Sequence, residues 1–403
     1  MPIADGIKNA LVSSSLIRKM FEEGGVLKKL HGEDKVFDFS LGNPDVDPPT
    51  AFHEALVKLA QADEKGSHGY MPNAGYPFVR EMLAKKISRE QNVEIDGSHV
   101  IMASGAAGGL NAVLKTICNP GDEVIVARPC FVEYRAYAAN HQAKLIEVDT
   151  FDDFNLNIKA IEAVLSEKTA AVLVNSPNNP TGKIYPASVL EELSALLTGY
   201  RKKTGRMPYL VSDEPYREIA YNVIVPPFLS CYSESIVVSS YSKNLSIPGE
   251  RIGYIAVNPA IACKDDLINC IAYSARVLGF VNAPALMQRI VAQLTDVQID
   301  VSIYERRRAA FMKVLDDAGI EYVKPEGAFY MFCKVPKNKE QRAGSNEQSG
   351  DDRAFIEHLK KFLILGVPGS GFGKSGWVRF AYCVDEKIIN ASADAFKAAM
   401  IQW

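Results

Sequence analysis

The chain has 403 residues, of which 47% are hydrophobic and 23% charged, and its formal net charge is −3. This composition is typical of a globular protein, and the length predicts two domains rather than one. A net charge this small excludes a general electrostatic attraction to nucleic acids or anionic membranes, so we expect neither as a partner.

The cysteines and the apolar runs bear on the cellular compartment of the protein. None of the seven cysteines lies in a Cys-x-x-Cys pair or in a spacing typical of a metal site, so we expect reduced thiols and no metal. The first fifteen residues lack the cationic and apolar regions of a signal peptide, and no apolar run is long enough to span a bilayer. These observations predict a cytoplasmic protein.

The middle of the chain alternates two patterns. After a helical pattern at 110–117, short runs rich in Val and Ile predict buried parallel strands at 123–127, 170–174, 209–212, 236–239 and 252–257. A second helical pattern, at 189–197, lies between two of these runs, and this alternation is typical of an α/β layer structure. Farther on, apolar residues over 284–315 predict one long helix, and the polar stretch 336–350 predicts a surface loop.

Polar and aromatic side chains follow four of the predicted strands at the point where each strand ends. In open parallel sheets, ligands bind outside the carboxyl ends of the strands. If the strands share one sheet, one crevice receives Phe131, Asn179, Asp213, Tyr216, Ser240 and Lys243.

Small residues precede the helical pattern at 110–117. Gly105, Ala106 and Ala107 would let the backbone approach a ligand closely. The N-terminus of the helix would then offer free N–H groups and the positive end of its dipole to a phosphate, although a tight turn is the ordinary interpretation of such residues.

Residues 368–375 read PGSGFGKS, which nearly matches the P-loop pattern GxxxxGK[ST], with Pro368 where the first glycine belongs. The stretch follows an apolar run at 362–367. A P-loop opens a helix, whereas the next residues, GWVRFAY, alternate like a strand. The pattern therefore favours a turn before a strand, and an NTPase is kept only as an alternative.

Six short motifs, in this order, resemble the class I/II aminotransferases, which are fold-type I enzymes of pyridoxal phosphate. They read YMPNAG at 70–75, NPGDEV at 119–124, SPNNPTG at 176–182, DEPY at 213–216, SK at 242–243 and RIG at 251–253. The similarity runs from SLGNP at 40–44 to WVRF at 377–380. It implies a large α/β domain at 47–285, with a mostly parallel sheet flanked by helices, and a smaller α+β domain made of 1–46 and 286–403.

The resemblance implies roles around the cofactor ring. Lys243 is similar to the lysine that binds the cofactor aldehyde and moves the proton at the substrate Cα, and Asp213 to the partner of the pyridine nitrogen. Tyr216 and Asn179 are similar to the pair that hydrogen-bonds the cofactor's phenolic oxygen, and Phe131 to the ring that stacks on the cofactor.

Other roles concern the phosphate and the subunits. Ser240 and Arg251, with the backbone N–H groups of residues 105–107, are similar to the phosphate-binding group, which suits the planar fork of an arginine. Tyr70 is similar to a residue that reaches the phosphate of the neighbouring subunit. The resemblance therefore implies a homodimer with composite sites.

The resemblance also places the substrate. Arg379 falls where the family binds the substrate α-carboxylate, and Gly42 and Asn179 where the family contacts the substrate. Some members with acidic substrates carry a lysine in the phosphate-loop region, where this chain has Ala107. Arg18 or Arg276 could supply that cation instead, so an aspartate-like donor is expected, with aromatic, alanine and branched-chain donors left open.

We therefore predict a pyridoxal-phosphate-dependent aminotransferase (EC 2.6.1.-) that exchanges an amino group between an L-amino acid and a 2-oxo acid by a ping-pong mechanism. Fold does not fix function, and the same scaffold hosts C–S lyases, cyclopropane-forming synthases and acyl-transferring condensing enzymes. A cofactor-binding regulator without catalysis is a further alternative.

Overall fold

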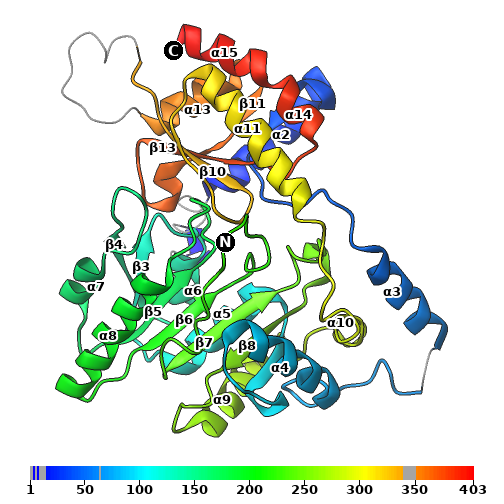
Figure 1. The fold of residues 1–403 in the computed structure, drawn as a ribbon, viewed down its shortest axis with the longest axis vertical. Coiled ribbons are helices and arrows are strands. Elements are labelled where there is room, and N and C mark those ends of the chain that lie inside the picture. Colours follow the sequence, from blue (N-terminus) through cyan, green and yellow to red (C-terminus); the bar gives the residue numbers. More distant parts are fainter. Residues whose placement is uncertain (1–2, 5–6, 9–14, 63–64, 339–350) are drawn as a thin grey trace.

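The computed structural model describes residues 3–4, 7–8, 15–62, 65–338 and 351–403. Its centre is a seven-stranded sheet in the order β2-β8-β7-β6-β5-β3-β4 (Figure 1). The strands are β2 (Val100–Ala103), β3 (Glu123–Arg128), β4 (Lys144–Asp149), β5 (Thr169–Asn175), β6 (Tyr209–Asp213), β7 (Ser235–Ser240) and β8 (Gly253–Val257). The five predicted strands are confirmed, with ends that shift by one residue; β2 and β4 were not predicted.

One strand differs from the prediction in direction. β8 runs antiparallel to both β2 and β7, whereas all five predicted strands were expected to be parallel. The connection from β7 to β8 holds only the 3-10 turn η3 (Pro248–Glu250), and a parallel return would need a crossover, usually a helix. Because of this short return, Lys243 and Arg251 both lie at the carboxyl end of β7.

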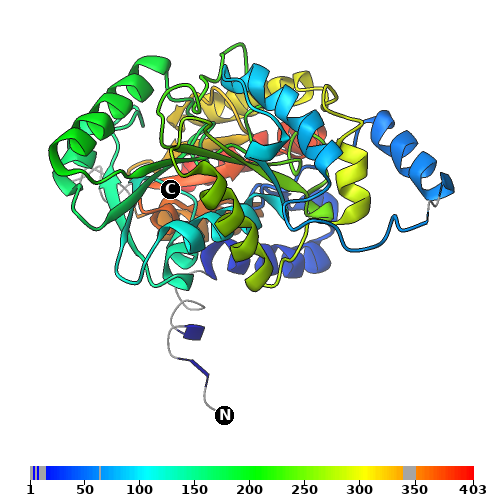
Figure 2. The same ribbon diagram turned by 90° about the horizontal axis from the view of Figure 1, so that it is seen from below.

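Helices cover both faces of the sheet (Figure 2). Successive side chains of a strand point to opposite faces, and Val124 and Ile125 accordingly enter different apolar cores. One face packs against α4 (Pro77–Gln91), α7 (Ile158–Val164) and α8 (Ala187–Thr204). The opposite face packs against α5 (Gly105–Ile117), α6 (Tyr134–Asn140) and α9 (Lys264–Val277).

A second apolar core lies around a small antiparallel sheet in the order β12-β13-β10-β9. Its strands are β9 (Tyr322–Val323), β10 (Tyr330–Lys334), β12 (Val367–Pro368) and β13 (Trp377–Ala381). The helices beside it are α2 (Ser15–His31), α11 (Ser302–Ala318), α13 (Asp352–Lys360), α14 (Glu386–Ala391) and α15 (Ala393–Gln402).

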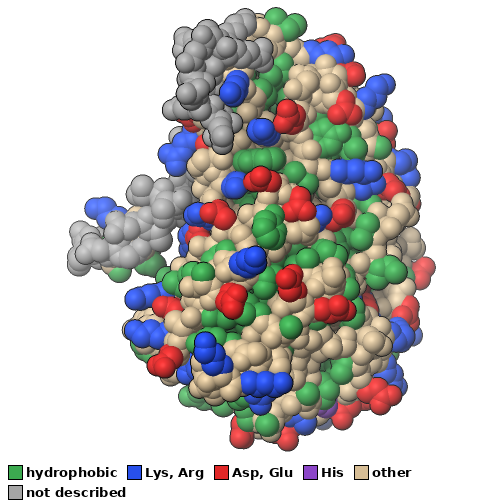
Figure 3. Space-filling model, turned by 60° about the vertical axis from the view of Figure 1, so that its left-hand side comes forward, with side chains coloured by type: hydrophobic (Ala, Val, Ile, Leu, Met, Phe, Trp, Pro, Cys, Tyr) green, Lys and Arg blue, Asp and Glu red, His purple; other side chains and the backbone are tan. Residues whose placement is uncertain are grey.

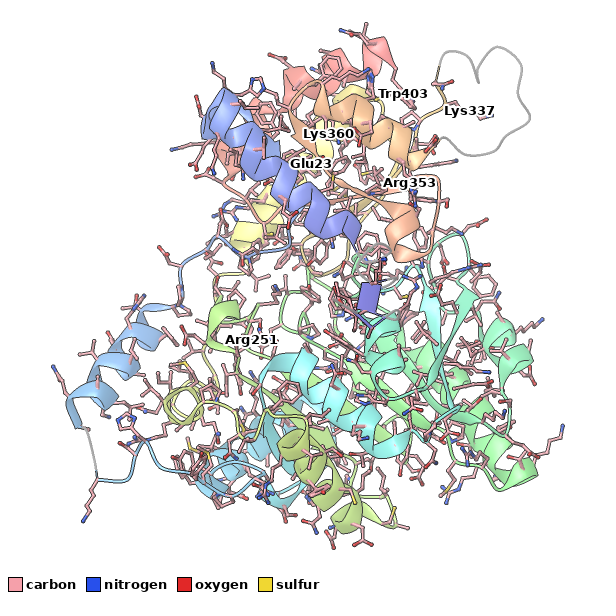
Figure 4. The ribbon with its side chains drawn as sticks, turned by 180° about the vertical axis from the view of Figure 1, so that it is seen from behind. Glu23, Arg251, Lys337, Arg353, Lys360 and Trp403 are labelled. Carbon is pink, nitrogen blue, oxygen red and sulfur yellow. The ribbon has the colours of Figure 1, made fainter. Side chains whose placement is uncertain are left out.

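The N-terminal segment belongs to this second core. β1 (Phe37–Asp38) pairs in parallel with β11 (Ile364–Leu365). Glu23 of α2 forms an ion pair with Lys360 of α13, with the two side chains 2.7 Å apart (Figure 4). Trp403 donates a hydrogen bond to the carbonyl of Pro336 at 2.8 Å. The described N-terminal segment and the last helix thus belong to one packed unit.

The long helix predicted at 284–315 is wrong. The chain forms α10 (Ala285–Val291) and, after a break, α11. In the break the N–H of Ile299 donates to the carbonyl of Asn244, and the Asp300 carboxylate accepts from the N–H of Ser302, which starts a new helix. α10 packs in the core of the large sheet. The division into domains stays a prediction.

The near match to a P-loop does not open a helix. Residues 369–372 form the 3-10 turn η4 (Gly369–Phe372), and β13 follows it, as the alternating pattern predicts. The apolar run before the turn forms the two short strands β11 and β12. Of the loop predicted at 336–350, residues 339–350 lie outside the described residues.

The helix α3 (Thr50–Ala62) projects from the side of the molecule (Figure 2). On the face shown in Figure 3, acidic and basic side chains are interspersed among apolar ones. Within the described ranges, no helix is both long and apolar enough to cross a membrane, and no group of three or more His, Cys, Asp or Glu could hold a metal ion.

Candidate active site

A cavity of about 270 Å³ lies outside the carboxyl ends of β3, β5, β6 and β7, between the two cores. The strand-end argument predicts this place, and the six residues it named all line the cavity. The wall is formed by Leu41, Gly42, Ala106, Ala107, Leu110, Phe131, Tyr137, Asn175, Asn179, Asp213, Pro215, Tyr216, Ser240, Ser242, Lys243, Pro248, Arg251, Tyr330 and Arg379.

Lys243 follows β7 and is partly exposed to the cavity. Its Nζ donates a hydrogen bond to the carbonyl of Gly42 at 2.9 Å and lies 5.5 Å from the centroid of the Phe329 ring. Burial, with a further contribution from the nearby Arg251 and Arg379 charges, lowers the pKa of Lys243 to about 8. The side chain is therefore a neutral amine for part of its population near neutral pH, unlike an exposed lysine.

Gly42 has to be a glycine because of its neighbour. A Cβ at this position would overlap the hydroxyl of Tyr330, which belongs to β10 of the second core. The close approach brings the Gly42 carbonyl to the lysine and the Tyr330 ring to the cavity wall. The N-terminal segment thus forms part of the site.

Asp213 ends β6 and is buried. Its Oδ2 accepts a hydrogen bond from the hydroxyl of Tyr134 at 2.6 Å, and its backbone carbonyl accepts from the side chain of Asn175 at 2.8 Å. Within the described part of the chain, its Oδ1 has no hydrogen-bond partner. Burial raises the pKa of Asp213 to about 7 although the Tyr134 hydrogen bond opposes the shift. A bound cation or N–H donor at Oδ1 would favour the ionised form.

Tyr216, which follows β6, and Tyr330 of β10 meet at the cavity and belong to the same apolar core. Their hydroxyl oxygens are 2.8 Å apart and their rings meet edge to face at 5.6 Å. Burial raises the pKa of both hydroxyls, that of Tyr330 to about 12, so both are protonated donors at neutral pH. They can donate to an oxygen of a ligand.

Arg379 of β13 is 2% exposed, and its guanidinium is held from several sides. Nη1 donates to Oδ1 of Asn179 at 3.1 Å and Nη2 to the carbonyl of Ser40 at 2.6 Å. Its Nε is buried and has no hydrogen-bond partner within the described part of the chain. No carboxylate among the described side chains pairs with Arg379, so its charge is available to an anionic ligand.

The opposite end of the cavity suits an anion. α5 begins at Gly105, and no side chain caps its first N–H groups. Gly105 has a φ of 71°, which favours glycine, and a Cβ there would lie only 2.7 Å from Nη2 of Arg251. A glycine at this position therefore lets the Arg251 guanidinium approach the start of the helix. Ser240 lies beside them on the cavity wall, and Figure 4 places Arg251 between the two cores.

Two predicted residues do not line the cavity of this chain. Tyr70 is 96% exposed, and Gly105 contributes its backbone behind Arg251. Arg276 is exposed on α9 and is not part of the wall either. The side chain of Arg18 lies outside the described part of the structure.

Sequence reasoning missed several residues of the site, namely Tyr134, Tyr137, Asn175, Ser242 and Tyr330. Asn175 ends a predicted strand and could have been found by the strand-end argument. Tyr137 lines the cavity from α6, a short helix with no clear pattern, and Tyr134 of the same helix lies behind the wall and bonds Asp213. Tyr330 comes from a strand of the small sheet.

Comparisons with known proteins agree with this geometry. Residues 34–396 match the family model for aminotransferase class I and II. The chain is 30% identical over 391 residues to an aspartate aminotransferase of Thermotoga maritima, covering 95% of this chain and 96% of that one. An aminotransferase structure from Eubacterium rectale has a TM-score of 0.93 at 32% identity, covering 100% of this chain and 99% of the other.

A second solved structure belongs to an aspartate aminotransferase. The aspartate aminotransferase of Thermus thermophilus, solved with maleate, has a TM-score of 0.84 at 26% identity and covers 96% of each chain. The matches extend over nearly the full length of this chain and of its relatives. The protein therefore belongs to the class I/II aminotransferases, and it is an aspartate-aminotransferase-like enzyme of the pyridoxal phosphate fold-type I.

Proposed function

We propose that this aminotransferase binds pyridoxal phosphate in the cavity and exchanges amino groups between an aspartate-like L-amino acid and a 2-oxo acid by a ping-pong mechanism. The observation that carries the proposal is the shared wall: the amine of Lys243, a buried Asp213 oxygen without a described partner, and an Arg251 guanidinium beside an uncapped helix start. An aldehyde, a pyridine nitrogen and a phosphate need these three groups.

The other wall residues fit the same ligand. Ser240 and the N–H groups of residues 105–107 would hold its phosphate with Arg251, and Phe131 would pack on its ring. Tyr216 and Asn179 would hydrogen-bond the phenolic oxygen. Tyr134 keeps the Asp213 carboxylate oriented through its 2.6 Å hydrogen bond.

Pyridoxal phosphate supplies an aldehyde that condenses with amines and a ring that withdraws electrons from the substrate Cα. Arg379 binds the α-carboxylate and holds the Cα near Lys243. The neutral amine of Lys243 takes the Cα proton and returns it to the product. The ionised Asp213 stabilises positive charge at the ring nitrogen, and closure of the two cores over the cavity excludes water.

The pH dependence of lysine reactivity follows from the lowered pKa of Lys243. Below about pH 8 its amine is mostly protonated and cannot attack an aldehyde. The rate at which cofactor-free protein gains visible absorbance with pyridoxal phosphate should therefore rise with pH and level off above about 8. Stopped-flow spectroscopy measures this rate, and a midpoint near the ordinary lysine value of 10.5 would contradict the assignment.

An aspartate-like donor is supported by the names of the relatives from Thermotoga maritima and Thermus thermophilus. Against it, the cations among the described wall residues are Lys243, Arg251 and Arg379, and each already has a proposed role. A second carboxylate would need a cation from a partner subunit or from a residue beyond those described. A relative of Thermococcus litoralis, 27% identical over 99% of this chain, is named an aromatic-amino-acid aminotransferase.

A panel of amino donors against 2-oxoglutarate and pyruvate tests the reaction and its donor. We expect a new amino acid to form in proportion to the oxo acid produced, with kcat/KM for aspartate exceeding that for tyrosine by at least about tenfold. Amino-acid analysis of the products is the measurement. Higher kcat/KM for tyrosine would overturn the donor, and release of pyruvate and ammonia without a new amino acid would indicate the lyase alternative.

We also propose a cytoplasmic homodimer in which Tyr70 reaches the phosphate of the neighbouring subunit. The nearly complete exposure of its ring, at 96%, supports this role because a tyrosine so exposed lacks a packing function in its own chain. Sedimentation equilibrium measures the assembly, and a monomer at the concentration of the assay would contradict it.

A further inference from the structure

The glycine-rich stretch at 368–375 has no role in the function described so far. Its turn η4 connects β12 to β13 and so belongs to the second core, yet it contacts the large sheet. The N–H of Cys130 donates to the carbonyl of Phe372 at 3.1 Å, and Nη1 of Arg135 donates to the carbonyl of Gly371 at 3.3 Å. In Figure 1 this segment, in orange, reaches the region of β3 and β4. The stretch is thus a contact between the two cores.

One glycine of the stretch, Gly373, serves this contact. Gly373 has a φ of 84°, and a Cβ there would lie 3.1 Å from Nη2 of Arg135 and 3.2 Å from Oε2 of Glu147. These two side chains form an ion pair between α6 and β4, with Nη2 and Oε2 2.9 Å apart. Gly373 therefore lets the turn lie directly on the ion pair, which explains this glycine without a bound phosphate.

The turn is also fixed from its own core. The N–H of Ser370 donates to the buried carboxylate of Asp352 at 2.6 Å. Phe372 is fully buried in an apolar cluster with Phe154, Phe332 and Val367. The backbone of Phe372 is therefore hydrogen-bonded to the segment after β3, while its ring packs with Phe332 and Val367 of the small sheet and with Phe154.

The Phe372 ring lies against the carboxylate-binding arginine. The guanidinium carbon of Arg379 is 4.9 Å from the centroid of Phe372 and 4.7 Å from that of Tyr330. A planar guanidinium is attracted to aromatic faces, most strongly where water is excluded. The two rings thus restrict where the guanidinium can lie, and its two hydrogen bonds fix its rotation.

We propose that Phe372 is a positioning residue that holds Arg379 at a fixed place relative to Phe131 on the cavity wall. Its carbonyl accepts a hydrogen bond from the N–H of Cys130, the residue before Phe131, and its ring packs on the Arg379 guanidinium. One residue thereby links the wall provided by the large sheet to the guanidinium provided by the small one. The inference rests on the proposed role of Arg379 in binding the substrate α-carboxylate.

The test replaces the ring and measures carboxylate binding. Phe372→Leu should raise KM for the amino acid and for the 2-oxo acid by about tenfold, while kcat falls by about threefold or less. The dissociation constants of succinate and 3-phenylpropionate, which carry a carboxylate but no amino group, should rise by about the same tenfold factor in calorimetry. Unchanged dissociation constants would overturn the role of Phe372.

Phe154→Leu is the matched control. It removes another buried ring of the same cluster, whose centroid is 5.5 Å from that of Phe332. Among the described contacts, the aromatic rings that lie against the Arg379 guanidinium are Tyr330 and Phe372, not Phe154. We expect a comparable fall in Tm and a KM that changes by about twofold or less. An equal rise of KM in both variants would show general loosening and overturn the proposal. If Phe372→Leu does not fold, Phe372→Met carries the same test, since methionine also lacks a ring face.

Arg379→Gln separates this inference from the function on which it rests. If the proposed function holds, Arg379→Gln raises the dissociation constants of both carboxylates, and adding Phe372→Leu raises them no further. Unchanged binding in Arg379→Gln would refute the carboxylate role itself. Weaker binding in Arg379→Gln, with wild-type binding in Phe372→Leu, would refute only the positioning role.

Discussion

Replacing Lys243 by alanine is expected to abolish transamination and the visible absorbance that pyridoxal phosphate acquires when a lysine binds it. Among the described residues that line the cavity, Lys243 alone carries a primary amine. The variant loses both the attachment of the cofactor and the proton transfer at Cα, and a positioned acid–base group alone supplies about 10²–10⁴-fold of rate. We therefore expect kcat to fall by at least about 10⁴-fold, measured with the best donor of the panel.

Lys374→Ala is the control for this experiment. Lys374 is the lysine of the stretch that nearly matches a P-loop, and it is not part of the cavity wall. The variant should keep the visible absorbance and the turnover of the wild type. Full turnover in Lys243→Ala would refute the catalytic assignment, and nucleotide binding that disappears in Lys374→Ala would instead revive the NTPase alternative.

Asp213→Asn is expected to have the second largest effect. An amide cannot stabilise positive charge on the ring nitrogen, so the ring withdraws electrons less strongly from Cα. Breaking a buried charge pair by removing one partner costs about 3–5 kcal/mol, which corresponds to a fall in kcat of about 10²–10⁴-fold. Single-turnover kinetics with the preferred donor measure the loss, and a kcat within about threefold of wild type would contradict the role of Asp213.

Glu214→Gln is the matched control, because Glu214 is the next residue and its buried carboxylate is not on the cavity wall. It accepts hydrogen bonds from Ser212 and Gln91, both at 2.8 Å, and pairs with Arg217 at 3.1 Å. The variant should lose stability and keep kcat within about threefold.

The cofactor-free protein gives a second measurement for Asp213. Its folded pKa of about 7 lies above the ordinary value of 3.8, so the folded state binds more protons than the unfolded state between these values. The free energy of unfolding should therefore decrease as the pH rises toward 7, and Asp213→Asn should remove this decrease. Denaturant titrations at several pH values test the sign.

Much of the large sheet and its ligand edge could be predicted from the sequence. Buried parallel strands are runs of Val and Ile, and their carboxyl ends carry Asp213, Asn179 and Ser240, so local patterns suffice to place these residues together. The direction of β8 could not be read in this way, because its sequence is as apolar as that of a parallel strand. Only the short return from β7 decides it.

The remainder of the site depends on contacts that no local pattern reveals. Tyr330 sits in an aromatic-rich strand where a tyrosine is indistinguishable from a core residue, and its hydroxyl meets Tyr216 only through tertiary packing. Likewise, the periodicity over 284–315 continues through the break between α10 and α11. There the Asn244 carbonyl and the Asp300 carboxylate accept hydrogen bonds from the backbone, and these bonds override the helical preference.

The pairing of β1 with β11 also has a consequence for the order of folding. Phe37 pairs with Ile364, so β1 cannot pair until β11, far later in the sequence, has left the ribosome. Gly42 and Ser40, which bind Lys243 and Arg379, are carried by this early segment. Because contacts so distant in sequence form late, we expect the large sheet to fold during synthesis while the site is assembled only after nearly the whole chain has emerged.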